Sequence, residues 1–346
     1  MPQPAPTKPP MSTGKKFLFG CGGCLGLTIF LAILGWVLLM AWVKKETVPA
    51  GGEVLLGPDT VSIVVVAPDG ADAGVAAFVR ALGQQIDRDR PEAIDPKLRE
   101  QMKRMKMEDA GQILLSFLPA TWARASTQGP LKDDACPVDL FSLSHWSNPV
   151  RWLGEKEAEG KATTNVPHGG TTIHVWAKGD ETEGIAFLEN HIVRGPDAKS
   201  IQAALDGLTS GKGPTGFVKE LRDRLTPKPH AWGLLVNQGE AAIREYGFLE
   251  GLPMSSAEVL GIAWEINVKG AEESKGRFHV KARDKGVAET LDRALAQRSE
   301  EVRYALKQEH DIEATFSQRV DGQWVVIDFE VKDLARRVIK AMSEGK

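Results

Sequence analysis

Hydrophobic and polar positions divide this chain into an apolar amino-terminal run and a long region with strand-like and helix-like patterns. The run, residues 17–43, holds no charged side chain and has a pair of lysines on each side. As a helix it would be about 40 Å long, enough to cross a hydrocarbon core of about 30 Å with some tilt. It therefore predicts one transmembrane helix. The alternative is a cleaved signal peptide, whose apolar core would be only about 7–15 residues long.

Beyond this run, β-branched stretches and period-two alternation predict strands, and apolar positions three and four residues apart predict helices. The predicted strands are 61–67, 121–126, 138–146, 171–177, 185–188, 191–194, 231–236, 259–268 and 277–283. The predicted helices are 72–87, 96–107, 108–118, 197–208, 240–249, 287–307 and 333–342.

A hairpin near the end of the chain has the clearest pattern. Asp321-Gly322 is a favoured two-residue turn between two alternating segments. Pairing around this turn places Phe316 opposite Ile327 on the apolar face.

The predicted elements recur in one order: strand, helix, two strands, helix, two strands, helix. This order predicts an α+β fold, in which an N-terminal transmembrane helix precedes a two-lobed ectodomain of mostly antiparallel sheets with helices packed on one face. The expected segments are a disordered cytoplasmic tail (1–16), a transmembrane helix (17–43), a linker (44–59), a first α+β lobe (60–208), a connecting loop and helix (209–229) and a second α+β lobe (230–346).

Charge indicates orientation and excludes one class of partner. Outside the apolar run and its flanks the chain carries 38 basic and 45 acidic residues, so it lacks the basic surface that nucleic-acid binding needs. The amino-terminal tail is slightly more positive than the other flank, where Lys44 and Lys45 precede Glu46. The positive-inside rule then predicts a single-pass protein of the bacterial inner membrane, with a cytoplasmic N-terminus and a periplasmic C-terminal domain.

Small residues within the apolar run suggest two kinds of contact. Gly22 and Gly26 have the small-xxx-small spacing that lets membrane helices approach closely, so they are candidate contacts of a homodimer. Cys21 and Cys24 have the spacing of a zinc or redox pair. Zinc would need two further ligands, and a redox motif would need a βαβ setting. We therefore predict no metal and no cofactor.

Three histidines, His168, His174 and His191, lie close together in the sequence and could converge if their strands pair. They have no carboxylate at the spacing of a metal site, and no His-Glu-x-x-His motif is present. We expect them to be exposed on strands.

The glycine-rich segment 207–213 is similar to a phosphate-binding loop but departs from it twice. It has three residues between its first two glycines instead of four, and a glycine where a hydroxyl residue should follow the lysine. A dyad of Ser210 and Lys212 has no supporting motif, and no Gly-x-Ser-x-Gly sequence is present. We therefore predict a loop here and no catalytic residue.

One predicted strand carries a basic stripe on a single face, formed by Arg277, His279, Lys281 and Arg283. The neighbouring strand has Gly261 and Ala263 beside Glu265, which would leave a gap next to the stripe. The stripe is our candidate contact for an anionic glycan, a lipid headgroup or an acidic partner segment. The alternative is a solvated strand face with cross-strand ion pairs.

Six tryptophans fall on predicted strands: Trp122, Trp146, Trp176, Trp232, Trp264 and Trp324. They could line an apolar groove for lipid or peptide, or they could fill the core. Core filling is the interpretation we favour.

The segment 184–208, two short strands and a turn followed by a helix, resembles a pattern in uncharacterised bacterial envelope proteins. The Gly-Cys-Gly-Gly-Cys opening of the apolar run is similar to many single-pass bacterial anchors. The resemblance implies a membrane helix followed by an α+β ectodomain of unknown function.

Together these patterns favour a non-enzymatic envelope protein. We expect residues 17–43 to contact the lipid bilayer and the ectodomain to bind a protein partner or an envelope component. A lipid- or lipoprotein-handling domain and a hydrolase of unrecognised type remain as alternatives.

Overall fold

The computed structural model describes residues 51–57, 59–67, 72–89, 100, 119–127, 137–143, 147–238, 256–270, 272–310 and 312–333. These residues form an α+β fold with a large antiparallel sheet, as the sequence predicts. The described helices are η1 (Gly52–Leu55), α2 (Ala73–Asp89), α5 (Ser147–Lys161), α6 (Ala198–Ser210), α7 (Gly216–Arg222), η5 (Ser256–Glu258) and α9 (Lys285–His310).

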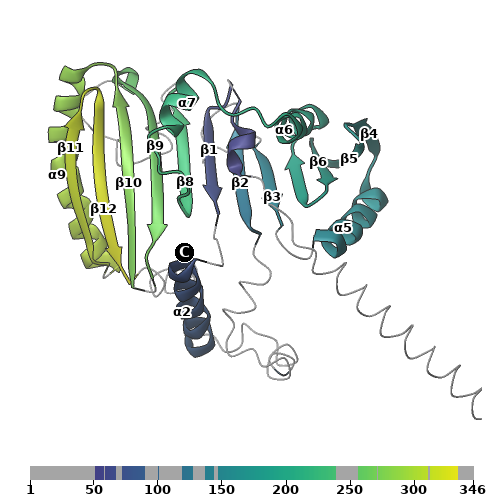
Figure 1. The fold of residues 1–346 in the computed structure, drawn as a ribbon, viewed down its shortest axis with the longest axis horizontal. Helices are drawn as coiled ribbons and strands as arrows, with labels where there is room; N and C mark the ends of the chain where they lie inside the picture. The colour runs from purple at the N-terminus through teal and green to yellow at the C-terminus, as the bar shows by residue number, and fades with distance from the viewer. Residues whose placement is uncertain are drawn as a thin grey trace, which may run out of the picture.

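The described strands are β1 (Ser62–Val66), β2 (Thr121–Ser126), β3 (Val138–Ser142), β4 (Thr164–His168), β5 (Thr171–Lys178), β6 (Glu181–Leu188), β7 (His191–Gly195), β8 (Ala231–Val236), β9 (Val259–Val268), β10 (Glu273–Ala282), β11 (Ala314–Asp321) and β12 (Trp324–Lys332). They form one sheet ordered β11-β12-β10-β9-β8-β1-β2-β3-β7-β6-β5-β4 (Figure 1).

The two halves of the chain meet where β1 pairs with β8. Ile63 lies opposite Leu234, and Val65 lies opposite Trp232. Because β1 begins the first half and β8 begins the second, one continuous hydrogen-bonded ladder joins the segments expected as two lobes.

Strand order repeats outward from this junction. The first half runs β1-β2-β3-β7-β6, and the second runs β8-β9-β10-β12-β11. In the first half the third strand, β3, pairs with β7, the second strand of the β6–β7 hairpin. In the second half the third strand, β10, pairs with β12, the second strand of the β11–β12 hairpin. The first half has an additional hairpin, β4–β5, at its outer edge. The recurring order of the predicted elements is thus present in the strand pairing.

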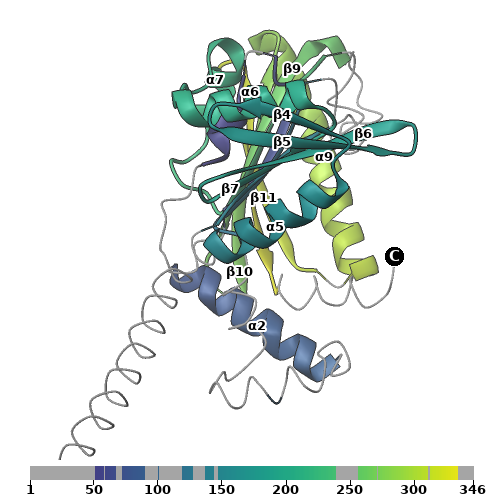
Figure 2. The same cartoon turned by 90° about the vertical axis from the view of Figure 1, so that its right-hand side faces the viewer.

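Helices cover both faces of the sheet, whereas the order of the predicted elements indicated helices on one face only. We call the face that carries η1, α6 and α7 the front face, and the face that carries α5 and α9 the back face (Figures 1 and 2). The reason is visible in the strands, where successive residues are both buried, such as Leu234 and Leu235 or Ile262 and Ala263. Strands that are apolar on both sides need cover on both sides.

Two apolar clusters correspond to the two faces. In the front cluster Ile201 of α6 and Leu221 of α7 pack with sheet residues such as Leu234. In the back cluster Leu291 and Leu295 of α9 pack on β8, β9, β10 and β12. All five of these side chains are at most 2% exposed.

The β11–β12 hairpin forms, but its predicted register is wrong by two residues. The loop is Gly322-Gln323, and Phe316 lies opposite Phe329 instead of Ile327. Gly322 has a φ of +61° at the first loop position, which is where a type II′ turn requires glycine. A shift of two residues leaves every side chain on its predicted face.

Several predictions concern residues outside the described ranges. They include the transmembrane helix 17–43 with Gly22 and Gly26, the strand end at Trp146, and the helices 108–118 and 240–249. The predicted helices 96–107 and 333–342 also lie outside these ranges, except for residue 100, which is helical, and residue 333. Among the residues that are described, no helix has the length and apolar character needed to cross a bilayer.

We expect two helical glycines to respond oppositely to alanine. A Cβ atom on Gly207 of α6 would lie 2.3 Å from the carbonyl oxygen of Val54, so the backbones of α6 and η1 would have to separate. Gly207→Ala should therefore lower the free energy of unfolding by about 1–3 kcal/mol. A Cβ atom on Gly160 of α5 would contact nothing within 4 Å, so Gly160→Ala should raise it by up to about 1 kcal/mol. Urea unfolding followed by tryptophan fluorescence measures both, and equal stabilisation by the two substitutions would contradict the close contact.

Candidate functional site

The basic stripe lies on the front face of β10, at the second half of the sheet. Alternation along the strand places Arg277, His279 and Lys281 on this face, and Arg283 follows directly after the strand end. The structure therefore brings together the four residues of the predicted stripe.

Each cation of the stripe has a carboxylate partner. Arg277 pairs with Asp328 of β12, and the Lys281 ammonium lies 2.8 Å from Glu220 of α7. Arg283 lies 3.4 Å from Asp284 and 3.6 Å from Glu258. An anionic ligand would have to displace these carboxylates, so the stripe by itself is not an open anion site.

The gap expected beside the stripe is filled by α7. A Cβ atom on Gly261 would lie 2.9 Å from the ring of Phe217, which belongs to α7. Ala263 is fully buried in the front cluster. The small residues of β9 thus let a helix approach the sheet, and no room for a ligand remains at that end of the strand.

Two of the strand tryptophans are buried beneath cations. Trp232 and Trp324 are each 2% exposed. The Arg222 guanidinium lies 4.9 Å from the Trp232 ring, and the Arg224 guanidinium lies 4.5 Å from the Trp324 ring. Lys281 also lies over Trp324, at 4.8 Å. These two rings pack in the core and do not line an open apolar groove.

His279 is buried, which the alternating pattern of the stripe did not predict. It is 5% exposed, and neither ring nitrogen has a hydrogen-bond partner in the described structure. The pKa of His279 is lowered to about 4, first by burial and then by the nearby guanidinium groups of Arg277, Arg224 and Arg319, while Asp328 acts in the opposite direction. The imidazole is therefore neutral at neutral pH.

Asp328 connects the stripe to the edge strand β11. Its carboxylate accepts hydrogen bonds from Arg277 and from Arg319 of β11. Burial raises the pKa of Asp328, but the two arginines outweigh that effect and the net shift is downward. A carboxylate held ionised between two guanidinium groups leaves a net positive charge at this point.

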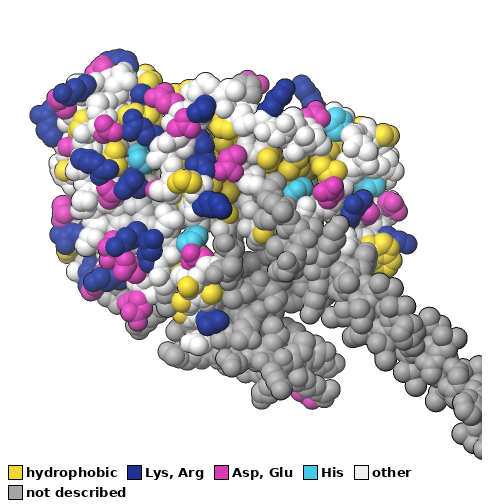
Figure 3. All heavy atoms as spheres, in the orientation of Figure 1, with side chains coloured by type: hydrophobic (Ala, Val, Ile, Leu, Met, Phe, Trp, Pro, Cys, Tyr) yellow, Lys and Arg dark blue, Asp and Glu magenta, His cyan; other side chains and the backbone are white. Residues whose placement is uncertain are grey.

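Beyond Arg277 the front face opens into a hollow of about 390 Å³. Its polar lining consists of Thr226, Glu265, Asn267, Lys269, Lys275, Arg277, Thr315, Ser317, Asp328 and Glu330. Three of these side chains are acidic and three are basic, and Figure 3 shows both kinds interspersed over this part of the sheet. The hollow offers many hydrogen-bonding groups and little net charge.

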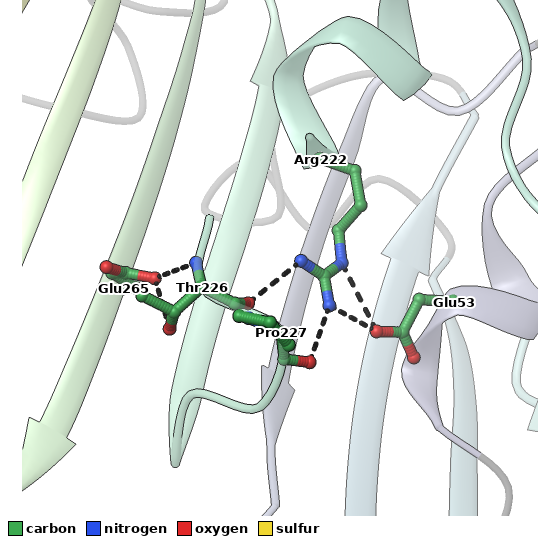
Figure 4. A network of polar contacts seen from close by, with 5 residues as sticks. All are labelled: Glu53, Arg222, Thr226, Pro227 and Glu265. Atoms are coloured by element: carbon green, nitrogen blue, oxygen red, sulfur yellow. Dashed lines mark hydrogen bonds and ion pairs between the residues drawn. The ribbon is translucent and has the colours of Figure 1, made fainter. Parts of the chain in front are cut away.

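One wall of the hollow is the loop between α7 and β8, which is held from both sides (Figure 4). Glu265 of β9 accepts hydrogen bonds from the Thr226 amide at 2.6 Å and from the Thr226 hydroxyl at 2.8 Å. Arg222 donates to the carbonyl oxygens of Thr226 and Pro227 and, at 2.7 Å, to the carboxylate of Glu53 in η1. These contacts link the first described helix, the loop and β9, so the wall is rigidly placed.

The described residues contain no group of three or more metal-ligating side chains placed to hold an ion. Among the described residues, one pair has the side chains of a nucleophile and a base: the Ser142 hydroxyl lies 3.0 Å from His191 across two paired strands. Ser142 is fully buried, so a substrate could not reach it.

The three histidines considered as a metal site do not converge. His168 pairs with Asp206 at 2.8 Å, and His174 contacts Asn165 at 2.8 Å. The expectation that they are exposed is wrong, because His174 is 5% exposed and His168 and His191 are half-buried. Alternation places His174 on the opposite face of β5 from Ile173, the face on which α5 packs.

The glycine-rich segment ends a helix. Gly211 has a φ of +60° directly after α6, the left-handed position that favours glycine at a helix C-terminus. The Ser210 hydroxyl accepts a hydrogen bond from the Lys212 amide, which is a local turn contact and not a side-chain dyad.

Neither a protein-family model nor a curated protein nor a solved structure matches this chain. The geometry of the front face is therefore the basis for functional inference.

We expect the buried His279 to make stability depend on pH. The folded chain protonates this imidazole only near pH 4, whereas the unfolded chain does so near 6.5. Between these values the unfolded state binds more protons, so stability falls as pH falls from 6.5 to 4 and this contribution levels off below. Between pH 7.5 and 4.5, the unfolding free energy of the parent chain should fall by about 2–3 kcal/mol more than that of the His279→Leu variant. Urea unfolding at both pH values measures this difference, and identical losses in the two chains would contradict it.

We expect Glu265 to hold the wall of the hollow. Glu265→Ala removes the acceptor of the two hydrogen bonds that Thr226 donates, and should lower the free energy of unfolding by about 2–4 kcal/mol. Glu265→Gln keeps one side-chain oxygen and should cost less than half as much. Amide hydrogen exchange at Thr226 should rise in the alanine variant. Equal stability and exchange in both variants would show that the loop is held by other contacts.

Proposed function

We propose that this chain is a membrane-anchored, non-enzymatic envelope protein whose ectodomain binds an extended segment of a partner protein at the hollow and the adjacent edge strand β11. Residues 17–43 serve as the anchor, with the N-terminus in the cytoplasm and the ectodomain in the periplasm. The support for this placement is the uncharged run and the distribution of its flanking lysines.

The observation that carries the proposal is the open hydrogen-bonding edge of β11. The Lys332 amide donates to the Glu313 carbonyl, and in an antiparallel ladder such pairs recur at every second residue. The amides and carbonyls of Phe316, Gln318 and Val320 therefore point away from β12. Within the described part of the chain these groups have no partner. Such an edge can add a strand from another protein.

The other edge of the sheet is less suited to this role. β4 has five residues, and one of them is Pro167, which has no amide hydrogen to donate. β11 has eight residues and no proline. Proline and short length are devices that protect sheet edges from pairing, and β11 lacks both.

The hollow would supply specificity to a strand added at β11. Thr315, Phe316 and Ser317 of β11 belong to its lining, so the hollow begins at this edge. Alternate side chains of an added strand would project over the front face, toward Asp328 and Glu330. The balanced charges and many polar groups of the hollow favour a polar segment.

We expect a photo-reactive amino acid at Ser317 to cross-link a partner in intact cells, and the same group at Tyr304 on α9 to give no such product. Val320→Pro removes an outward amide without removing a hydrogen bond to β12, and should reduce the cross-link severalfold. Val320→Thr keeps the amide and serves as the matched control, and thermal unfolding confirms that both variants are folded. Equal cross-linking in the two variants, or recovery of only the chain itself, would refute strand addition at β11.

A further inference from the structure

We propose that the first turns of α5 dock on the lipid surface beside the anchor, through Trp152 and Leu153. This inference rests on the proposed anchor at residues 17–43. It adds a second membrane contact, which would orient the ectodomain relative to the bilayer.

Few large apolar side chains are exposed in the described structure, and most of the exposed ones belong to α5. Trp152 is 53% exposed, Leu153 is 60% exposed and Val150 is 37% exposed. Among the described residues the only other large hydrophobic side chain in this class is Tyr304 on α9. Trp152 and Leu153 are adjacent and form a local apolar patch, whereas Val150 lies one helical turn before Gly154, on the side of α5 that faces the sheet.

The helix is oriented so that this patch points away from the sheet. Gly154 and Ala158 face the sheet, since a Cβ atom on Gly154 would lie 2.6 Å from the Phe187 ring and Ala158 is buried. At 100° per residue, Trp152 and Leu153 therefore project from the opposite side of α5, away from the sheet. Lys156 shares their face, with its ammonium 5.4 Å from the Trp152 ring.

The patch lies at the end of the sheet where the chain enters the domain. Gly52 packs on Val65, which is next to the last residue of β1. At the same end of the strands, Thr121 of β2 pairs with Ser142, the last residue of β3, and α5 begins five residues later. Figure 1 shows α5 at the lower end of the sheet, where β1 also ends.

The linker keeps this end close to the bilayer. Residues 44–51 separate the predicted span from η1, and eight residues extend at most about 28 Å. A domain of this size has a radius of gyration of about 19 Å, so the end that carries α5 can reach the lipid surface.

A lipid surface suits this patch better than a protein partner or a second copy. Stable protein interfaces bury more than about 1,000 Å² in total, far more than two exposed side chains provide. Tethering, by contrast, makes even a weak contact with the bilayer effectively intramolecular. Tryptophan prefers the headgroup region, and a lysine beside it can extend its ammonium toward lipid phosphates.

The test uses the full chain in vesicles of phosphatidylethanolamine and phosphatidylglycerol. The three native cysteines, Cys21, Cys24 and Cys136, are changed to serine. An environment-sensitive fluorophore is then attached at Leu153→Cys or, as the matched exposed control, at Tyr304→Cys. We expect the label at position 153 to shift to shorter wavelength and to be quenched severalfold more by a headgroup-level lipid quencher than the label at 304.

The outcomes separate the two proposals. Equal quenching at positions 153 and 304 in a chain that resists carbonate extraction would overturn docking by α5 and leave the anchor intact. Release of the chain by carbonate would overturn the anchor and docking with it. Shielding of position 153 that disappears when vesicles hold one chain each would identify a second copy, not lipid, as the occupant. Trp152→Glu should expose the label at position 153 again.

Discussion

The antiparallel pairing of β1 with β8 is the constraint on which the rest of the structure depends. It joins two halves with the same strand order into one sheet, so the front faces of both halves form one continuous surface. The loop before β8 then lies next to η1, where Arg222 can contact Glu53 while Glu265 holds Thr226. The wall of the hollow is thus a consequence of how the halves are joined.

The candidate site arises where helical cover of the front face ends. α7 covers β8 and part of β9, with Phe217 packed against Gly261. Farther along the same strands the front face carries polar side chains instead, and the hollow begins there. Ion pairs such as Arg277 with Asp328 balance the charge of this region, so its recognition properties come from hydrogen-bonding groups and from the edge of β11.

Much of the strand content could be predicted from the sequence, because alternation and β-branched residues are local signals. The bounds of β2, β8 and β9 agree with prediction, while α5 was missed because Gly154 and exposed Trp152 break an amphipathic pattern. The basic stripe was also found from alternation. Cross-strand ion pairs were the alternative that the sequence also allowed, and Arg277 with Asp328 is such a pair. The pairing of Lys281 with α7, the burial of His279 and the hollow were not predicted, because they depend on which distant segments pack beside β10. Such contacts leave no periodic signal in the sequence.

The central claim is that the outward amides of β11 and the neighbouring hollow hold a segment of another protein. Hydrogen–deuterium exchange of the chain in native membranes, compared with the purified chain, tests it most directly. The account predicts slower exchange in native membranes for the peptide spanning residues 314–321, with the exposed surface of α9 unchanged. Identical exchange of residues 314–321 in the two preparations would contradict it.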